Sequence, residues 1–123
     1  MLKINILPCL EDNYSFVIHD VETNTVAVVD PSEFEPISNF IEKKFKKIDY
    51  ILNTHHHVDH TGGNLDLKKK YKAKIIGSKK DKKRIPGIDI RLSDNENFKI
   101  GNIVFEIFFI PGHTSGHVCF YSK

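Results

Sequence analysis

The apolar run Val26–Val29 restricts the fold more than any other stretch of this sequence. Four consecutive apolar residues in a strand place apolar side chains on both of its faces. Such a strand must be covered on both sides, so it belongs inside a layered domain. Two further strands are predicted before it, Leu2–Ile6 and Tyr14–His19, with turn residues between them.

A helix is predicted directly after this run. Pro36 suits its first turn, and its apolar residues recur every three or four positions in one stripe, namely Ile37, Phe40, Ile41, Phe45 and Ile48. A second apolar strand follows at Asp49–Asn53, and another helix is expected from Thr61 to about Tyr71. Residues 78–89 are expected to be mostly loop, and the remaining predicted strands are Ala73–Gly77, Ile88–Leu92, Phe98–Ile100, Ile103–Ile110 and His117–Tyr121. This alternation predicts an α/β fold with a mixed sheet and helices packed outside it.

Size and charge narrow the class of protein. The chain has 123 residues, which is one domain at most, and a net charge of +2 indicates neither a nucleic-acid nor a membrane partner. No apolar run approaches the roughly 20 residues that cross a bilayer. The lysine-rich stretch 68–84 is interpreted as a solvent-facing surface. Two cysteines without a spacing motif favour a reducing, cytoplasmic location.

Potential metal ligands gather immediately after the strand Asp49–Asn53. The cluster comprises His55, His56, His57, Asp59 and His60. His55 and His57 are two apart, so in an extended segment they project to one side and could bind one metal, while His56 points away. A turn near residue 58 would direct Asp59 and His60 to a second position. Imidazole and carboxylate ligands suit zinc, iron or manganese.

A second histidine-containing motif follows the strand Ile103–Ile110. Pro111 and Gly112 predict a sharp turn that presents His113 at the edge of the sheet, 53 positions after His60. Together with the first cluster, this placement favours His113 as a further metal ligand. His117 begins the next strand, and we expect it to have a structural role or to support a ligand.

These motifs together resemble the metallo-β-lactamase superfamily, and within it the glyoxalase II (hydroxyacylglutathione hydrolase) family. The resemblance rests on residues 54–64 and 111–121, on Asp12-Asn13-Tyr14 and on Asp30-Pro31. It covers essentially the whole chain. It implies an αββα sandwich, in which two sheets are packed between outer helices, and residues 1–123 form a partial domain, its N-terminal half.

By this resemblance, His55, His57 and His113 hold one zinc ion, and Asp59 and His60 help to hold a second. The implied reaction is hydrolysis of S-lactoylglutathione to lactate and glutathione by a metal-activated hydroxide. Asp59 is the implied catalytic residue, because its carboxylate could orient the hydroxide or accept its proton. The implied partner is a small glutathione thioester.

The resemblance ends before the family's later motifs. The family continues into a Gly-Asp segment that bridges both metals, a further histidine and a helical region that contacts glutathione. No residue here matches these, so the second metal site is expected to be incomplete and the last strand to leave an unpaired sheet edge. A complementing C-terminal fragment is therefore a candidate partner.

Three alternatives stay open from the sequence. The site could belong to another hydrolase of the same fold, such as a lactonase or a different thioesterase, or to a relative that oxidises persulfides. The chain could also be a metal-binding remnant without activity. The sequence does not decide among them.

Overall fold

The computed structural model describes residues 2–9, 13–54, 61–79, 85, 87–109 and 118–121. Within these ranges the elements follow one another as β1 (Leu2–Cys9), β2 (Asn13–Asp20), β3 (Thr25–Val29), α1 (Phe34–Lys44), β4 (Tyr50–Leu52), α3 (Asn64–Tyr71), β5 (Lys74–Ser78), β6 (Ile90–Leu92), β7 (Asn97–Ile100), β8 (Ile103–Phe109) and β9 (Val118–Tyr121). None of the described helices is long and apolar enough to span a membrane.

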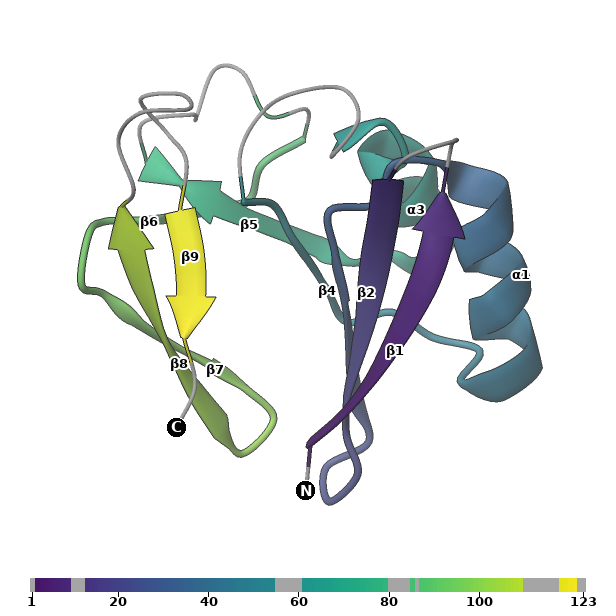
Figure 1. Ribbon diagram of the computed structural model, residues 1–123, viewed down its shortest axis with the longest axis horizontal. Coiled ribbons are helices and arrows are strands. Elements are labelled where there is room, and N and C mark those ends of the chain that lie inside the picture. The colour runs from purple at the N-terminus through teal and green to yellow at the C-terminus, as the bar shows by residue number, and fades with distance from the viewer. Residues whose placement is uncertain are drawn as a thin grey trace.

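The strands form two sheets. A six-stranded sheet has the order β1-β2-β3-β4-β5-β6, in which β1 to β3 pair antiparallel and β3 to β6 pair parallel. A three-stranded antiparallel sheet has the order β7-β8-β9. Figure 1 shows α1 and α3 on the side of the larger sheet away from the smaller one. The predicted α/β architecture with a mixed sheet and outer helices is therefore confirmed.

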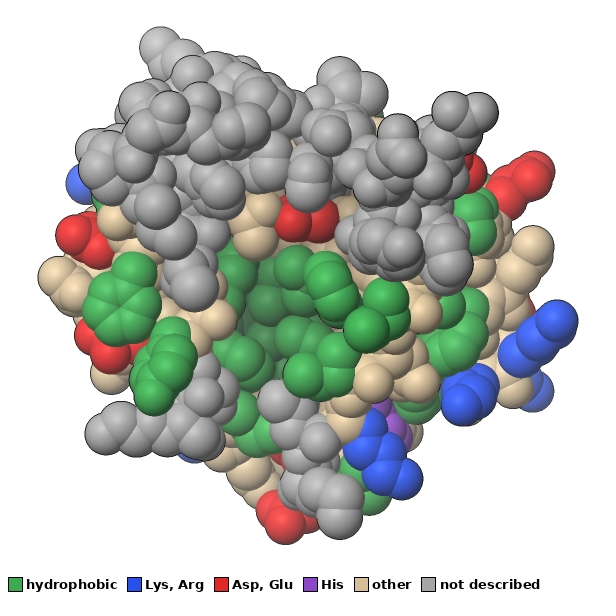
Figure 2. All heavy atoms as spheres, in the orientation of Figure 1, with side chains coloured by type: hydrophobic (Ala, Val, Ile, Leu, Met, Phe, Trp, Pro, Cys, Tyr) green, Lys and Arg blue, Asp and Glu red, His purple; other side chains and the backbone are tan. Residues whose placement is uncertain are grey.

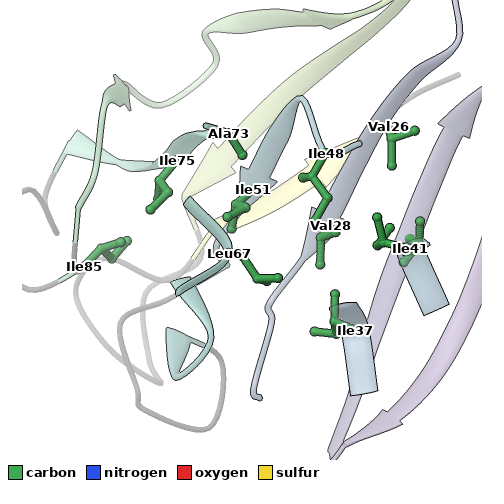
Figure 3. Close-up of a cluster of buried hydrophobic side chains, with 11 residues drawn as sticks. Val26, Val28, Ile37, Ile41, Ile48, Ile51, Leu67, Ala73, Ile75 and Ile85 are labelled. Atoms are coloured by element: carbon green, nitrogen blue, oxygen red, sulfur yellow. The ribbon is translucent and has the colours of Figure 1, made fainter. Parts of the chain in front are cut away.

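Strand β3 is buried on both faces, as its apolar run predicts. Val26, Ala27 and Val28 are each 0% exposed. Val26 and Val28 pack with Ile37 and Ile41 of α1, in the cluster shown in Figure 3, whereas Ala27 belongs to the cluster between the two sheets. The chain therefore has one core between sheet and helices and a second core between the sheets.

Helix α1 ends earlier than its apolar stripe. The stripe extends to Ile48, but the helix stops at Lys44, so a helix continuing to Ile48 is wrong. The backbone N–H groups of Phe45 and Lys46 both donate to the carbonyl of Ile41, and Lys46 has φ +60. The Phe45 bond is the last with helical spacing, and the five-residue bond of Lys46 together with its left-handed backbone ends the helix. Ile48 still packs into the same core, because the turn brings its side chain back to the sheet.

A polar contact joins the larger sheet to the β7–β8 turn. The buried Asp20 carboxylate, at the end of β2, accepts hydrogen bonds from the backbone N–H of Asn102 (2.8 Å) and from the hydroxyl of Thr23 (2.8 Å). Gly101 has φ +60, and a Cβ atom there would overlap the side-chain oxygens of Asp20 and Thr23. The turn between β7 and β8 therefore requires glycine for both conformation and space.

Replacing Gly101 with alanine should therefore destabilise the fold. Both the left-handed backbone and the overlap with Asp20 oppose a side chain, so we expect Gly101→Ala to lower the free energy of unfolding by more than about 1 kcal/mol. Urea denaturation followed by circular dichroism measures this change. Asn102→Ala is the matched control, because it keeps the backbone N–H that Asp20 accepts; it should stay within about 0.5 kcal/mol of wild type. Equal stability of Gly101→Ala and wild type would contradict the prediction.

The same contact predicts a pH dependence of stability. The Asn102 N–H, and after it the Thr23 hydroxyl, lower the pKa of Asp20 below its ordinary value of 3.8. Because the folded pKa is the lower one, the stabilisation is present above the unfolded pKa and is lost as the pH falls through the folded one. We expect the difference in urea midpoint between wild type and Asp20→Asn to shrink as the pH falls from neutral to about 3. A difference that stays constant over this range would rule the linkage out.

Candidate metal centre

The predicted metal ligands all lie outside the described residues. This holds for His55, His57, Asp59, His60 and His113, and also for His56 and His117. In the part of the chain that the structure describes, no group of three or more His, Cys, Asp or Glu could hold a metal ion. The assignment of these ligands stays a prediction, and the structure describes the residues that flank them.

The two predicted ligand segments leave the sheets from a shared core. Leu52 ends β4, three positions before His55, and Phe109 ends β8, four positions before His113. Both contribute to the cluster between the two sheets. In Figure 1 the described chain leaves β4 and β8 on the same, upper side of the view. This is the edge at which the carboxyl ends of strands commonly form binding sites in α/β proteins.

Asp30 is hydrogen-bonded to Thr54, directly before the predicted ligand segment that begins at His55. Its carboxylate accepts hydrogen bonds from the backbone N–H (2.8 Å) and from the hydroxyl (2.6 Å) of Thr54, the residue before His55. Asp30 is 5% exposed and has φ +51, a conformation that aspartate and asparagine adopt more readily than most residues. Its own backbone N–H donates to the Leu52 carbonyl, and its carbonyl accepts the Ser15 hydroxyl. The β3–α1 connection therefore fixes the end of β4.

The β3–α1 connection also holds the chain directly after the histidine segment, at Gly63. The N–H of Gly63 donates to the carbonyl of Pro31 (2.8 Å). A Cβ atom on Gly63 would lie 3.1 Å from the backbone carbon and oxygen of Glu33, so this approach favours glycine. Residues 54 and 63, on either side of the histidine segment, are thus both hydrogen-bonded to residues 30 and 31.

A buried pair of amides adds a third connection. Asn53 and Asn64 are each 0% exposed. The amide nitrogen of Asn64 donates to the side-chain oxygen of Asn53 (2.7 Å), and that of Asn53 donates to Asn64 in return (3.3 Å). Buried polar side chains cost free energy unless they are hydrogen-bonded, and this reciprocal pairing provides such bonds. It joins the end of β4 to the first residue of α3.

Sequence reasoning missed this framework in part. Asp30 belongs to the motifs that carry the family resemblance, but its hydrogen bond to Thr54 spans 24 positions. Asn53 and Asn64 flank the histidine cluster, yet nothing local in the sequence pairs them. A polar residue directly after a buried strand was the available signal, and it indicates a site without naming the partner.

Comparison with known proteins identifies the family. The sequence model described as "Metallo-beta-lactamase superfamily" matches residues 10–123. The chain belongs to the metallo-β-lactamase superfamily. The expected superfamily and its glyoxalase II-like branch are confirmed, since curated relatives named hydroxyacylglutathione hydrolase match almost the whole chain. The protein of Pelagibacter ubique (strain HTCC1062) is 52% identical over 120 residues, and that of Methylococcus capsulatus (strain ATCC 33009 / NCIMB 11132 / Bath) is 42% identical over 121.

Solved structures of this superfamily share the fold. The crystal structure of the BLEG-1 B3 metallo-beta-lactamase superposes with a TM-score of 0.86 at 19% identity, over 98% of this chain and 67% of that one. The crystal structure of ETHE1 from Myxococcus xanthus superposes with a TM-score of 0.84 at 20% identity, over 98% of this chain and 53% of that one. The expected metallo-β-lactamase fold is therefore confirmed.

The alignment covers almost all of this chain but only about half of each relative. It includes 98% of this chain in both named relatives, but 50% of the Pelagibacter ubique protein and 47% of the Methylococcus capsulatus protein. The chain thus spans about half the length of the curated relatives it matches.

The framework around the histidine segment yields a direct test. We expect Asp30→Asn, which keeps the left-handed backbone but cannot accept both Thr54 bonds, to lower the free energy of unfolding by about 1.5–3 kcal/mol. Urea denaturation measures the loss. Asp66→Asn, at an exposed position on α3, is the matched control and should stay within about 0.5 kcal/mol of wild type.

A double-mutant cycle with Thr54→Val separates this bond from general damage. The two substitutions remove the same hydrogen bond, so their combined effect should be smaller than the sum of the single effects. Strict additivity would mean that Asp30 and Thr54 do not stabilise each other.

Proposed function

We propose that this chain carries the metal-binding half of a glyoxalase II-type thioester hydrolase that converts S-lactoylglutathione to lactate and glutathione. The observation that supports this most strongly is the 52% identity, over 98% of the chain, to a protein named hydroxyacylglutathione hydrolase. Relatives at this level of identity usually keep the chemistry of their site, whereas the solved structures above are too distant to indicate a substrate. A glutathione thioester is therefore the proposed substrate class.

The donor set of this chain fits a divalent metal. In the proposal, His55, His57 and His113 hold one ion, and Asp59 and His60 contribute to a second. Imidazole nitrogens with a carboxylate suit zinc, and also iron or manganese. When bound, such an ion lowers the pKa of water and polarises the substrate carbonyl.

The remaining steps rest on the chain's own residues. The Asp59 carboxylate would orient the attacking water and accept its proton, as a general base does. The hydrogen bonds of Asp30 to Thr54 and of Gly63 to Pro31 hold both ends of the ligand segment. Fixed ends reduce the conformational freedom that the histidines lose on binding metal, and this favours a defined geometry.

Within residues 1–123 the second metal has only Asp59 and His60 as proposed ligands. We therefore assign the full activity to a site that further polypeptide completes, including the surface that contacts the glutathione moiety. The first metal has three proposed ligands here, so this chain alone should bind one ion more tightly than a second.

Zinc binding tests the ligand assignment without requiring activity. We expect His55→Ala to weaken zinc binding at least about tenfold, because even indirect changes around a metal ligand cost 10–100-fold. Competition against a chromophoric chelator measures the affinity. His56→Ala is the matched control, since its side chain is predicted to point away, and it should bind zinc as wild type does. Equal affinities for His55→Ala, His56→Ala and wild type would exclude His55 as a ligand.

Activity is tested by the loss of S-lactoylglutathione absorbance after zinc is added to the chain. Turnover above that of free zinc, abolished by Asp59→Ala, would support the proposed role of Asp59. Turnover equal to that of free zinc would show that residues 1–123 alone are not the enzyme. The zinc titration still decides the ligand assignment in that case.

A further inference from the structure

The carboxylate of Asp94 binds the end of β8. Its Oδ1 atom accepts a hydrogen bond from the backbone N–H of Phe109 at 2.8 Å, and the two residues are 15 positions apart in the sequence. Phe109 is the last residue of β8 and lies four positions before the predicted ligand His113. A hydrogen bond between a carboxylate and a backbone N–H is charge-assisted, so it is stronger than a bond between neutral groups. Asp94 therefore restrains the strand end from which the second predicted ligand segment continues.

The turn that carries Asp94 is itself bonded to β8. This turn comprises residues 93–96, between β6 and β7. The carbonyl of Ile107 accepts the N–H of Asn95 (2.8 Å), and the N–H of Ile107 donates to the carbonyl of Glu96 (2.9 Å). Alternate residues of a strand direct their N–H groups to the same neighbour. Two residues after Ile107, the side chain of Asp94 takes the place of a backbone acceptor, and so it adds one more bond to this edge of β8.

The same turn connects the two sheets, because β6 belongs to the larger sheet and β7 to the smaller one. Leu92, at the end of β6, is 2% exposed and packs in the core between the sheets. In the orientation of Figure 1, Figure 2 shows hydrophobic side chains gathered in a hollow at the centre of the view. Apolar contact is non-directional, so it holds the sheets together without fixing a strand along its own axis. The hydrogen bond of Asp94 is directional and supplies this restraint.

A carboxylate thus holds the chain in front of each predicted ligand segment. Asp30 accepts the N–H of Thr54 before the first segment, and Asp94 accepts the N–H of Phe109 before the second, each at 2.8 Å. The preceding strands, β4 and β8, belong to different sheets, so the distance between the two segments depends on both restraints. A ligand that is already in place loses less conformational freedom when it binds a metal.

We propose that Asp94 is a positioning residue for the metal site, and that its bond to Phe109 sets where His113 lies relative to the ligands that follow β4. The role requires no contact between Asp94 and the metal or the substrate. Because His113 is taken as a ligand, this role rests on the proposed function. Loss of the bond gives His113 a wider range of positions, so the chain holds its metal ion less tightly.

The zinc affinity of Asp94→Ala tests this role on the complete 123-residue chain. Competition against a chromophoric chelator should show binding at least about threefold weaker than in wild type, a smaller loss than removal of a ligand causes, because Asp94 acts through the backbone. Glu96→Ala is the matched control and should bind zinc as wild type does. The Glu96 carboxylate accepts the N–H of Ser93 within the same turn (2.8 Å), so its removal leaves the bond to Phe109 in place.

A second substitution at the same position guards against a loss of folding. Asp94 is exposed, so Asp94→Ala should keep the circular dichroism spectrum of wild type. Asp94→Asn keeps an oxygen that can accept the N–H, although the bond loses its charge. It should therefore bind zinc more tightly than Asp94→Ala.

A double-mutant cycle shows whether Asp94 acts through His113. In a His113→Ala background, Asp94→Ala should cause no further loss of zinc affinity, because the ligand that it positions is gone. In a His55→Ala background, the same substitution should still weaken zinc binding. A general loss of stability would instead weaken binding equally in both backgrounds.

Hydrogen exchange in the metal-free chain measures the bond itself. The amide of Phe109 should exchange faster in Asp94→Ala than in wild type, because it loses its acceptor. The amide of Ile107 donates to a backbone carbonyl that the substitution leaves in place, so its exchange should change less.

The outcomes separate the role of Asp94 from the ligand assignment. Wild-type zinc affinity in Asp94→Ala, unchanged exchange at Phe109, or equal losses in the two backgrounds would overturn the role of Asp94 and leave the ligands as proposed. Wild-type zinc affinity in His113→Ala would overturn the assignment of His113 as a ligand, and the role of Asp94 with it.

Discussion

The hydrogen bonds made by the β3–α1 connection hold together the part of the structure from which the predicted metal ligands emerge. Asp30 binds Thr54 with its carboxylate, and Pro31 binds Gly63 with its carbonyl. Two adjacent residues therefore set where the histidine segment begins and where it ends. Asp30 and Pro31 directly follow β3, whose apolar residues are buried in both cores. The packing of β3 therefore fixes the position of the two residues that hold the histidine segment.

Local patterns were sufficient to predict the strands and the helices, because each depends on neighbours in sequence. The apolar run of β3 required burial on both faces whatever covered it. The end of α1 was not predictable from periodicity, because Phe45 and Ile48 continue the stripe although a left-handed Lys46 ends the helix. The histidine spacing identified the family but left open the bonds that fix its segment. Asp30 with Thr54 and Asn53 with Asn64 are brought together only by strand order.

The family assignment rests on almost the whole chain, whereas the functional assignment depends on the few side chains of the site. Almost the whole chain matches the superfamily, and its two sheets and outer helices follow the superfamily's layers. Function in such folds depends on side chains collected from several strand ends. In this chain the described strand ends include those of β4 and β8, which flank the two predicted ligand segments.

The contact between Asp20 and the β7–β8 turn has a consequence for the order of folding. Its hydrogen bond joins residues 82 positions apart, whereas the β1–β2 and β2–β3 hairpins pair close neighbours in sequence. Contacts of large sequence separation close long loops and form slowly, since the entropy of closure must be lost before the contact stabilises the fold. The hairpins and the helix-covered core can therefore form first, and docking of the smaller sheet becomes the late step. Until then the apolar face of the larger sheet is open along its whole width, and the chain is most prone to aggregate at that stage.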